Sequence, residues 1–296
     1  MNMKFHAIFA SALLSCSPAV VTVRAQEEEV VAAVLSSGSG AYTNSLAGFE
    51  KEWGRAVPVI NMAGANAELP RNTGIIAAFG AKAAMRPYPD GLTLIYWAPA
   101  MGGEQTGRAG RVIKINLAPR PDILAARLKE IQPKLKLLRI FFMAEHLTAY
   151  IEELRSAFRP LGIAIQAGKL GRREDLPDAM RAMNAKPDAL LVLNDPALIN
   201  AQTFAVLKDY SWANGVPFYA PTSGLVEQGA TACVAPSFAE LGRAAAQTAR
   251  KVSAGSPVGE EVYPEVNELT VNLAAAEKAG LVFSEEFLKN ARKVSP

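Results

Sequence analysis

The sequence predicts an α/β protein of two lobes, in which each lobe is a parallel sheet flanked by helices. Its 296 residues, of which 50% are hydrophobic and 20% charged, are enough to bury two cores of ordinary size. Unbroken apolar runs, typical of parallel strands buried on both faces, alternate along the chain with segments of helical spacing. A proline-flanked break at Leu117–Pro121 separates two such series, and prolines restrict the backbone at linkers.

The first series begins with a strand at Val30–Leu35, which runs into a loop of serine and glycine and then into a helix. A helix N-terminus carries partial positive charge and free N–H groups. We therefore expect Ser36, Ser37 and Tyr42 to offer hydroxyl and N–H groups to a carboxylate. The loop lacks the third glycine of a dinucleotide-binding fingerprint and the Gly-Lys-Ser/Thr of a phosphate-binding loop, which argues against nucleotide binding. Further strands are predicted at Val57–Met62, Ile75–Phe79 and Leu92–Trp97.

The second series centres on an apolar strand at Leu190–Leu193 that stops at Asn194-Asp195-Pro196. A helix follows, then a strand at Val216–Ala220 that runs into Pro221-Thr222-Ser223-Gly224. Ligands of open parallel sheets bind beyond the carboxyl ends of the strands, so Asp195, Thr222 and Ser223 are expected to line one wall of a cleft. The alternative is that they are ordinary turn residues. Other strands are predicted at Leu137–Met143, Ile163–Gln166, around Cys233 and at Leu269–Leu273, with helices at Asp175–Met183, Phe238–Val252 and Ala274–Ala279.

An ordered series of segments, strongest after Arg139, carries a resemblance to a known family. It comprises a strand ending in Asp-Pro, a helix, Val-Pro-Phe-Tyr-Ala-Pro-Thr-Ser-Gly, Val-Glu-Gln-Gly-Ala, Pro-Ser-Phe, a Glu-Leu-Gly-Arg-Ala-Ala-Ala helix and Leu-Thr-Val-Asn-Leu. The chain resembles the substrate-binding proteins of ABC transporters, which have the type I periplasmic-binding-protein fold, and most of all a subfamily that binds tryptophan and related aromatic amino acids.

This resemblance implies three crossovers between the lobes. The first lobe is then expected at residues 26–117 and 236–262, and the second at residues 118–235 and 263–296. It also places Gly80 and Ala81 in the loop beneath the ligand. Tyr96 and Trp97 are aromatic residues typical of a core or rim, but at a strand end facing the cleft one of them, expected to be Trp97, can stack on a ligand ring. The sequence departs from the family between Ala63 and Asn72, where a helix is reduced to a short stretch, so this half of the pocket is expected to differ.

The N-terminus predicts export. Lys4, an apolar core at Phe5–Leu14 and the exit at Ala25 are typical of a signal peptide at residues 1–25, which is too short in its apolar core to anchor the chain. The alternative is a lipoprotein anchored through Cys16, because Leu-Leu-Ser-Cys resembles a lipidation box.

The charge and cysteine content argue against some classes of function, such as nucleic-acid binding. Cleavage after Ala25 would remove two basic residues and no acid, so the 31 basic residues become 29 against 28 acidic and the net charge falls from +3 to +1. Basic residues alternate with acids along the helices, which argues against nucleic-acid binding. Cys233 lies in an apolar strand and is expected to be a buried, inert thiol. His146 is expected to be a polar residue at a helix start near the cleft.

The favoured function is a periplasmic receptor that closes two lobes on a small zwitterion and hands it to the membrane permease of an ABC transporter. We expect a monomer without cofactor or metal. In this hypothesis the first lobe holds the ligand carboxylate, and Asp195, with Thr222 and Ser223, holds its ammonium. One alternative is a sensor that signals to a membrane partner without transport. Another is an enzyme. The absence of metal-spaced histidines, a cofactor fingerprint and a nucleophile elbow from the sequence argues against it. Asp195 and Glu227 are the one carboxylate pair that could act as acid and base.

Overall fold

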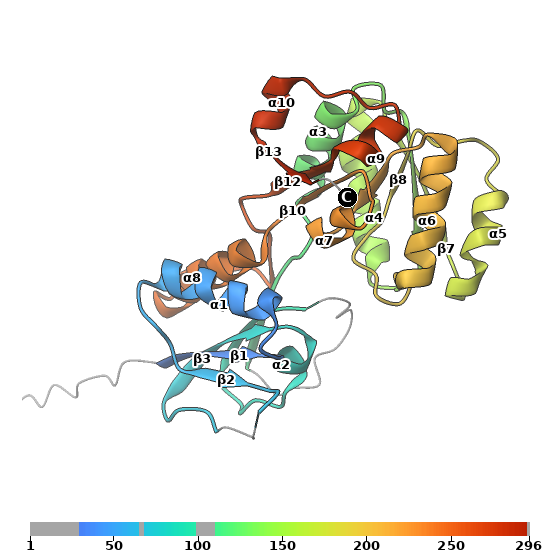
Figure 1. The fold of residues 1–296 in the computed structure, drawn as a ribbon. Coiled ribbons are helices and arrows are strands. Elements are labelled where there is room, and N and C mark those ends of the chain that lie inside the picture. The colour runs from blue at the N-terminus through green and yellow to red at the C-terminus, as the bar shows by residue number, and fades with distance from the viewer. Residues whose placement is uncertain (1–29, 65–67, 99–109, 295–296) are drawn as a thin grey trace, which may run out of the picture.

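The computed structural model describes residues 30–64, 68–98 and 110–294, and it places them in two lobes (Figure 1). Three connecting segments, called passages below, join the lobes. The predicted signal peptide and Cys16 lie outside the described residues, as does the middle of the Ala63–Asn72 stretch. Within the described ranges, no helix combines the length and the apolar character needed to cross a membrane.

The first lobe is built on a sheet in which every neighbouring pair of strands is parallel, in the order β11-β5-β4-β3-β1-β2. The apolar runs predicted as strands form its centre, because β1 and β3 are buried along most of their length. Its elements are β1 (Val30–Leu35), α1 (Gly40–Trp53), β2 (Val59–Asn61), β3 (Thr73–Phe79), α2 (Ala81–Met85), β4 (Thr93–Trp97), β5 (Arg111–Ile115), α8 (Phe238–Ser253) and β11 (Glu261–Val262).

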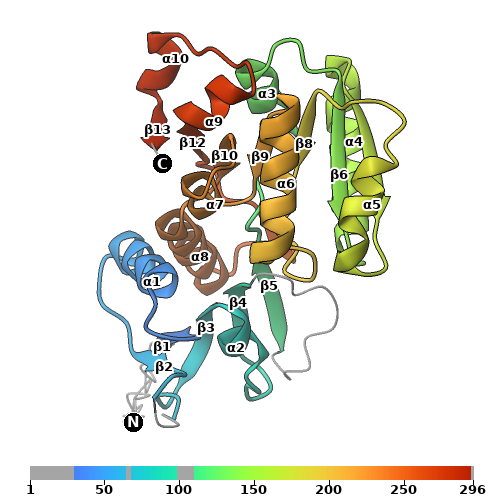
Figure 2. The ribbon, with the colours of Figure 1, turned by 45° about the vertical axis from the view of Figure 1, so that its right-hand side comes forward.

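Helices α1 and α8 lie side by side on one face of this sheet, and the short α2 lies on the other (Figure 2). The two long helices touch through glycine. A Cβ atom at Gly242 of α8 would sit 1.8 Å from the Ser45 carbonyl oxygen, and one at Gly48 of α1 would sit 2.0 Å from the Ala239 carbonyl oxygen. The hydroxyl of Ser45 also donates to the Phe238 carbonyl at 2.8 Å. Helix α8, which follows the chain's return from the second lobe, is therefore packed closely against α1 of the first lobe.

The second lobe has a sheet in the order β13-β12-β10-β9-β8-β6-β7, in which only the β10–β12 pair is antiparallel. Helices α3 and α4 cover one face, and α5, α6 and α7 cover the other. The elements are α3 (Pro121–Ile131), β6 (Leu137–Phe142), α4 (Leu147–Phe158), β7 (Ala164–Lys169), α5 (Leu176–Arg181), β8 (Ala189–Leu191), α6 (Ala201–Asn214), β9 (Phe218–Ala220), α7 (Ser223–Glu227), β10 (Ala232–Ala235), β12 (Glu268–Asn272), α9 (Leu273–Lys278), α10 (Glu285–Lys289) and β13 (Ala291–Val294).

The chain passes between the two sheets three times: from β5 to α3, from β10 to α8, and from β11 to β12. Helix α4 holds two of these passages, because the Tyr150 hydroxyl donates to the Pro119 carbonyl at 2.8 Å and the Tyr263 hydroxyl lies 3.4 Å from a Glu153 oxygen. The predicted fold class of two α/β lobes with helix-covered sheets is confirmed, with the one antiparallel pair in the second sheet as a difference.

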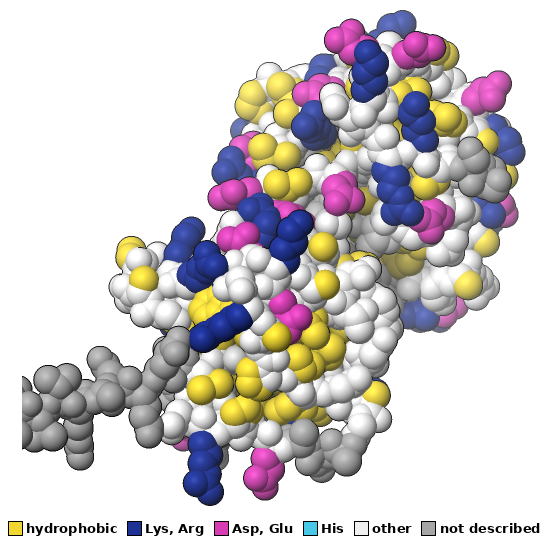
Figure 3. All heavy atoms as spheres, turned by 60° about the vertical axis from the view of Figure 1, so that its left-hand side comes forward, with side chains coloured by type: hydrophobic (Ala, Val, Ile, Leu, Met, Phe, Trp, Pro, Cys, Tyr) yellow, Lys and Arg dark blue, Asp and Glu magenta, His cyan; other side chains and the backbone are white. Residues whose placement is uncertain are grey.

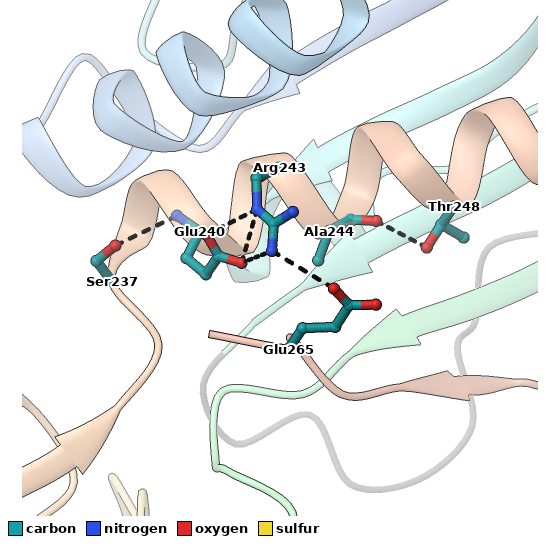
Figure 4. Close-up of polar contacts among 6 residues, drawn as sticks. All are labelled: Ser237, Glu240, Arg243, Ala244, Thr248 and Glu265. Atoms are coloured by element: carbon teal, nitrogen blue, oxygen red, sulfur yellow. Dashed lines mark hydrogen bonds and ion pairs between the residues drawn. The ribbon is translucent and has the colours of Figure 1, made fainter. Parts of the chain in front are cut away.

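The start of α8 anchors the second passage (Figure 4). Ser237 caps the helix by accepting from the Glu240 N–H at 3.3 Å. On the next turn, the Glu240 carboxylate accepts hydrogen bonds from the Arg243 guanidinium. A second carboxylate, that of Glu265 in the third passage, lies 4.0 Å from Arg243. Two separate passages of chain thus meet at one arginine.

The surface carries charges of both signs. On the face shown in Figure 3, basic and acidic side chains are interspersed over both lobes, and hydrophobic side chains gather on the first lobe. Among the exposed apolar residues of that lobe are Val59, which is 43% exposed, and Met85, which is 57% exposed.

Candidate ligand-binding site

A cavity of about 150 Å³ lies where the carboxyl ends of the second sheet meet the passages between the lobes. Most of its apolar lining belongs to the second lobe, whereas its polar lining comes from both lobes. The apolar lining includes Leu117, Leu124, Leu128, Leu147, Leu191, Leu193 and Val234. The polar lining is Lys114, Asn116, His146, Tyr150, Glu153, Asn194, Tyr219, Glu261 and Tyr263.

The first lobe contributes a charged group at the ends of β5 and β11. Lys114 Nζ lies 3.0 Å from one oxygen of Glu261, and Asn116 Nδ2 donates to the other oxygen at 3.2 Å. Burial raises the pKa of the Glu261 carboxyl, but the hydrogen bonds from Lys114 and Asn116 outweigh it, so that its pKa lies below the ordinary value. Glu261 is therefore a carboxylate that holds Lys114 at the rim.

The second lobe contributes the first turns of α4, where His146, Tyr150 and Glu153 line the cavity. Burial lowers the pKa of the His146 imidazole, and the positive charge of Lys114 lowers it further, while the charge of Asp195 acts in the opposite direction. The imidazole is therefore neutral at neutral pH. Burial raises the pKa of the hydroxyl of the half-buried Tyr150, and this hydroxyl donates a hydrogen bond to the Pro119 carbonyl in the first passage.

Asp195 has a different role from the one predicted. It is 1% exposed and does not line the cavity. One carboxylate oxygen accepts from the N–H groups of Met143 and Ala144 at 2.6 and 3.1 Å, and the other accepts from those of Ala197 and Leu198 at 3.1 and 3.3 Å. An ionised carboxylate has about four acceptor positions, and backbone groups use them all. Asp195 therefore ties the loop after β6 to the loop after β8 and has no acceptor left for a ligand ammonium.

The loop after β1 is also partly committed to the protein itself. Ser36 is 5% exposed, and its hydroxyl oxygen accepts from the Ala83 N–H at 3.0 Å, which holds the first turn of α2. Gly80 has φ +95°, and a Cβ there would lie 2.4 Å from the Tyr42 ring. Ser37 and Ala81 are half-buried beside these residues. Gly80 thus allows the strand end, the loop and the Tyr42 ring to approach closely.

Three aromatic side chains meet at the same end of the first lobe. The Trp97 ring stacks on Tyr42 with ring centres 5.5 Å apart, and it lies 5.4 Å from the Phe238 ring. Trp97 is 2% exposed, and its buried Nε1 has no hydrogen-bond partner among the described residues. The next residue, Ala98, lines the cavity. The aromatic group therefore adjoins the cavity without forming its wall.

Thr222 and Ser223 begin α7 and are half-buried, and the residue before them, Pro221, lines the cavity. Glu227, the other member of the carboxylate pair considered for catalysis, is exposed and paired with Arg292 at 2.6 Å. That pair is therefore not a catalytic couple, because Asp195 is buried and fully bonded. Among the described residues, no group of three or more histidine, cysteine or acidic side chains is placed to hold a metal.

None of the nine residues predicted to bind the ligand lines the cavity, although three of its lining residues, Ala98, Asn194 and Pro221, are their immediate neighbours. Lys114, Asn116 and Glu261 were missed because β5 and β11 were not predicted as strands. A signal was present for β5: Val112, Ile113 and Ile115 are β-branched residues in a short run that follows Gly110, which is typical of a strand.

Comparisons with known proteins agree with this architecture. A family model described as "ABC transporter substrate binding protein" matches residues 125–295, which is more than half of the chain. No curated protein matches in a sequence comparison. A structure from Streptococcus pneumonia, an ABC domain in complex with L-Trp, is 15% identical with a TM-score of 0.58, over 90% of this chain and 99% of that one.

Two further solved structures are similar. A ligand-free, open substrate-binding protein with adhesive properties from Clostridium difficile is 15% identical with a TM-score of 0.63, over 90% of this chain and 99% of that one. A conserved domain protein from Vibrio cholerae is 15% identical with a TM-score of 0.58, over 91% and 100% of the two chains. At such identities these likenesses concern the fold, and the family model carries the assignment. The chain belongs to the family of ABC transporter substrate-binding proteins.

Proposed function

We propose that this protein is the periplasmic solute-binding component of an ABC-type uptake system, and that its two lobes close on an amino acid or a similar zwitterion. The observation that carries the proposal is the cavity at the passages, whose polar rim is shared between Lys114, Asn116 and Glu261 of the first sheet and His146, Tyr150 and Glu153 of α4. A ligand seated there contacts both lobes, so it binds the closed form more tightly and shifts the population towards it. The protein acts as a receptor and catalyses no reaction.

The lobe boundaries predicted from the sequence are part of the proposal. Each lobe has its own sheet and core, and the three passages at Leu117–Pro121, Pro236 and Tyr263–Asn267 are the places where backbone rotation can move one against the other. Two passages are hydrogen-bonded to α4, so α4 stays with the passages while the first lobe rotates.

An apolar or aromatic side chain is the part of the ligand that the first lobe suits. The Tyr42 ring is half-buried and stacked on Trp97, which precedes the cavity residue Ala98, and we expect its exposed part to meet a ring of the ligand on closure. Stacking of aromatic rings contributes about 0.5–1.5 kcal/mol beyond area burial. Ser37, Thr222 and Ser223 are the predicted hydroxyl groups that remain half-buried near the cleft and can hydrogen-bond the polar part of the ligand.

Export with cleavage after Ala25 is a further part of the proposal, and it is supported by the pattern of Lys4 and Phe5–Leu14. Intact-mass measurement of the protein purified from the cell envelope tests it. A mature chain that begins at Gln26 is expected, working as a monomer that meets its permease at the membrane. A mass that corresponds to an acylated Cys16 would instead show a lipoprotein.

The function is tested by a thermal-shift screen of the mature chain with amino acids, amino-acid amides, sugars and purines. A ligand present at about 100 times its Kd stabilises the folded form by about 2.7 kcal/mol. For a protein of this size that corresponds to a rise in Tm of about 5–10 °C. We expect such a rise with an aromatic or branched amino acid. Shifts confined to sugars or purines would refute the zwitterion, and the absence of any shift across the panel would refute the small-solute receptor.

The role of the aromatic group has its own variant. Tyr42→Ala removes the half-buried ring that stacks on Trp97 beside the cavity, and it is expected to weaken the binding of an aromatic ligand about 2- to 10-fold, measured by calorimetry. Tyr210→Ala is the matched control, because Tyr210 is a half-buried tyrosine on α6 that does not line the cavity. Equal affinity of the two variants would remove Tyr42 from the site.

A further inference from the structure

We propose that Lys114 and His146, which belong to opposite lobes, form a pair that binds the carboxylate of the ligand and holds the lobes closed. This inference rests on the proposed function and names the residues and the ligand group at its centre. It replaces the predicted division, in which the serine loop held the carboxylate and Asp195 held the ammonium.

Lys114 has donors to spare. It lies near the end of β5, with its side chain 28% exposed, and the described residues engage its ammonium through the single contact to Glu261 at 3.0 Å. A lysine ammonium has three N–H donors, so two of them remain for a ligand. Glu261 is itself held by Asn116, and together they fix the direction in which Lys114 extends along the rim.

His146 faces the same cavity from the second lobe. Its imidazole makes no hydrogen bond with any described residue, although the side chain is half-buried and lines the cavity. Asp195 holds the loop that leads to His146, by accepting from the N–H groups of Met143 and Ala144. Asp195 is therefore a positioning residue: it keeps the loop after β6 in place, and that loop presents the histidine to the cavity.

The charges around His146 favour an anion between the two side chains. Lys114 is the cation that acts on the imidazole, and its effect is larger than the opposing effect of the Asp195 carboxylate, whose oxygens already accept from four backbone N–H groups. The other charged groups on the surrounding elements have partners of their own. These are Glu145 with Lys169 of β7, Glu153 with the Tyr263 hydroxyl, and Glu261 with Lys114 and Asn116.

A carboxylate suits the pair better than a neutral group. Its two oxygens can accept from the Lys114 ammonium and from the imidazole at the same time, and such charge-assisted bonds are about twice as strong as neutral ones. Because one donor comes from each lobe, each bond that forms also disfavours reopening. The ligand class that follows is a small molecule with a free carboxylate, so an amino acid is expected to bind and its amide to be rejected.

The pair also couples binding to a proton. Burial and the Lys114 charge hold the pKa of free His146 below its ordinary value. A bound carboxylate raises that pKa in the complex, because an opposite charge favours the charged imidazole. Affinity for a carboxylate ligand is therefore highest below the pKa of the free protein, and it falls as the pH rises through the pKa of the complex. Binding between these two pKa values takes up a proton.

The test uses acetate, the simplest carboxylate, and does not require the natural ligand to be known. In the mature chain from Gln26, His146 is the only histidine, so its imidazole resonances in the NMR spectrum report its pKa without assignment. The pKa is measured in sodium acetate and in sodium chloride at equal ionic strength. We expect acetate to raise the pKa of His146 by at least about half a unit relative to chloride.

Three variants complete the test. Lys114→Met removes the positive charge and is expected to lose most of the acetate-dependent shift in the pKa of His146. Lys114→Arg keeps the charge and is expected to retain the shift. It also tests the role of this charge if Lys114→Met is unstable. Lys169→Met is the matched control: Lys169 also pairs with a glutamate in the second lobe but does not line the cavity, so its variant should keep the full shift.

Two results would overturn the pair. One is the same His146 pKa in acetate and chloride for the unaltered protein, and the other is an acetate shift that survives in Lys114→Met. Neither result bears on whether amino acids stabilise the protein in the thermal-shift screen, so failure of this inference is distinguishable from failure of the proposed function. Conversely, an acetate shift with no amino-acid ligand would keep the pair and refute the ligand class.

Discussion

Replacement of Asp195 by alanine should destabilise the second lobe strongly. The carboxylate accepts four backbone N–H groups, two from the loop after β6 and two from the loop after β8. In Asp195→Ala these donors lose their acceptor. Ala197 is exposed and can turn to water, but Leu198 is buried, and Met143 and Ala144 are held half-buried over the sheet edge.

The size of the effect follows from the donors that water cannot fully serve. A buried donor left without a partner costs about 1–3 kcal/mol. If two of the four pay this penalty and the others are rehydrated, the free energy of unfolding should fall by about 3 kcal/mol. This corresponds to a drop in Tm of about 6–12 °C for a chain of this size. The stability of Asp195→Asn should lie between that of the unaltered protein and that of Asp195→Ala. Its amide oxygen still accepts from one loop, while its NH₂ group faces the N–H donors of the other.

Denaturant unfolding followed by circular dichroism measures the loss, and amide hydrogen exchange locates it. Protection should decrease at Met143 and Leu198 before it changes elsewhere in the second lobe. Asp209→Asn on α6 is the control, since Asp209 is exposed, and it should change stability by less than about 0.5 kcal/mol. The reasoning would be refuted if Asp195→Ala behaved like this control, or if exchange at Met143 and Leu198 were unchanged.

Three further predictions concern packing and reactivity. Gly242→Ala should lower the stability of the first lobe by about 2 kcal/mol, because its Cβ would lie 1.8 Å from the Ser45 carbonyl oxygen. Gly40→Ala is the control and should leave the stability unchanged, because its Cβ would have no atom within 4 Å. A thermal melt in which both variants match the unaltered protein would contradict this prediction. Burial raises the pKa of the Cys233 thiol to about 12, so it should resist thiol reagents near neutral pH until the protein is unfolded, and rapid labelling of the native state would show that the strand opens. Tyr150→Phe should cost about 1 kcal/mol by removing the donor to the first passage, measured by denaturant unfolding, and a neutral effect would mean that this bond is not formed in solution.

Much of the fold follows from local patterns in the sequence. The central strands β1, β3, β4 and β6 coincide with predicted apolar runs because a parallel strand covered on both faces requires apolar residues at consecutive positions. Edge strands lack this requirement, which is why β11 and β13 were not predicted from Glu-Val and Ala-Arg-Lys-Val. The helix α10 was missed for a related reason: it has only five residues, too few for helical spacing to show.

The site was less predictable because its parts come from distant segments. A carboxylate at the end of a buried strand is a fair candidate for ligand binding, but whether backbone N–H groups converge on it is decided by two other loops, and at Asp195 they do. Lys114 and His146 are 32 positions apart on different lobes, and no spacing rule connects them. What the sequence did indicate was the region: Trp97, Asp195 and Thr222 are each the immediate neighbour of a residue that lines the cavity.

The central claim is that the two lobes close on a ligand, and small-angle X-ray scattering of the mature chain tests it most directly. The amino acid that raises the Tm is added at saturating concentration, and the radius of gyration is compared with that of the free protein. We expect a smaller radius of gyration and a more compact distance distribution with the ligand, because the first lobe rotates towards α4 over the cavity. Identical scattering curves for the free and saturated protein would contradict the account.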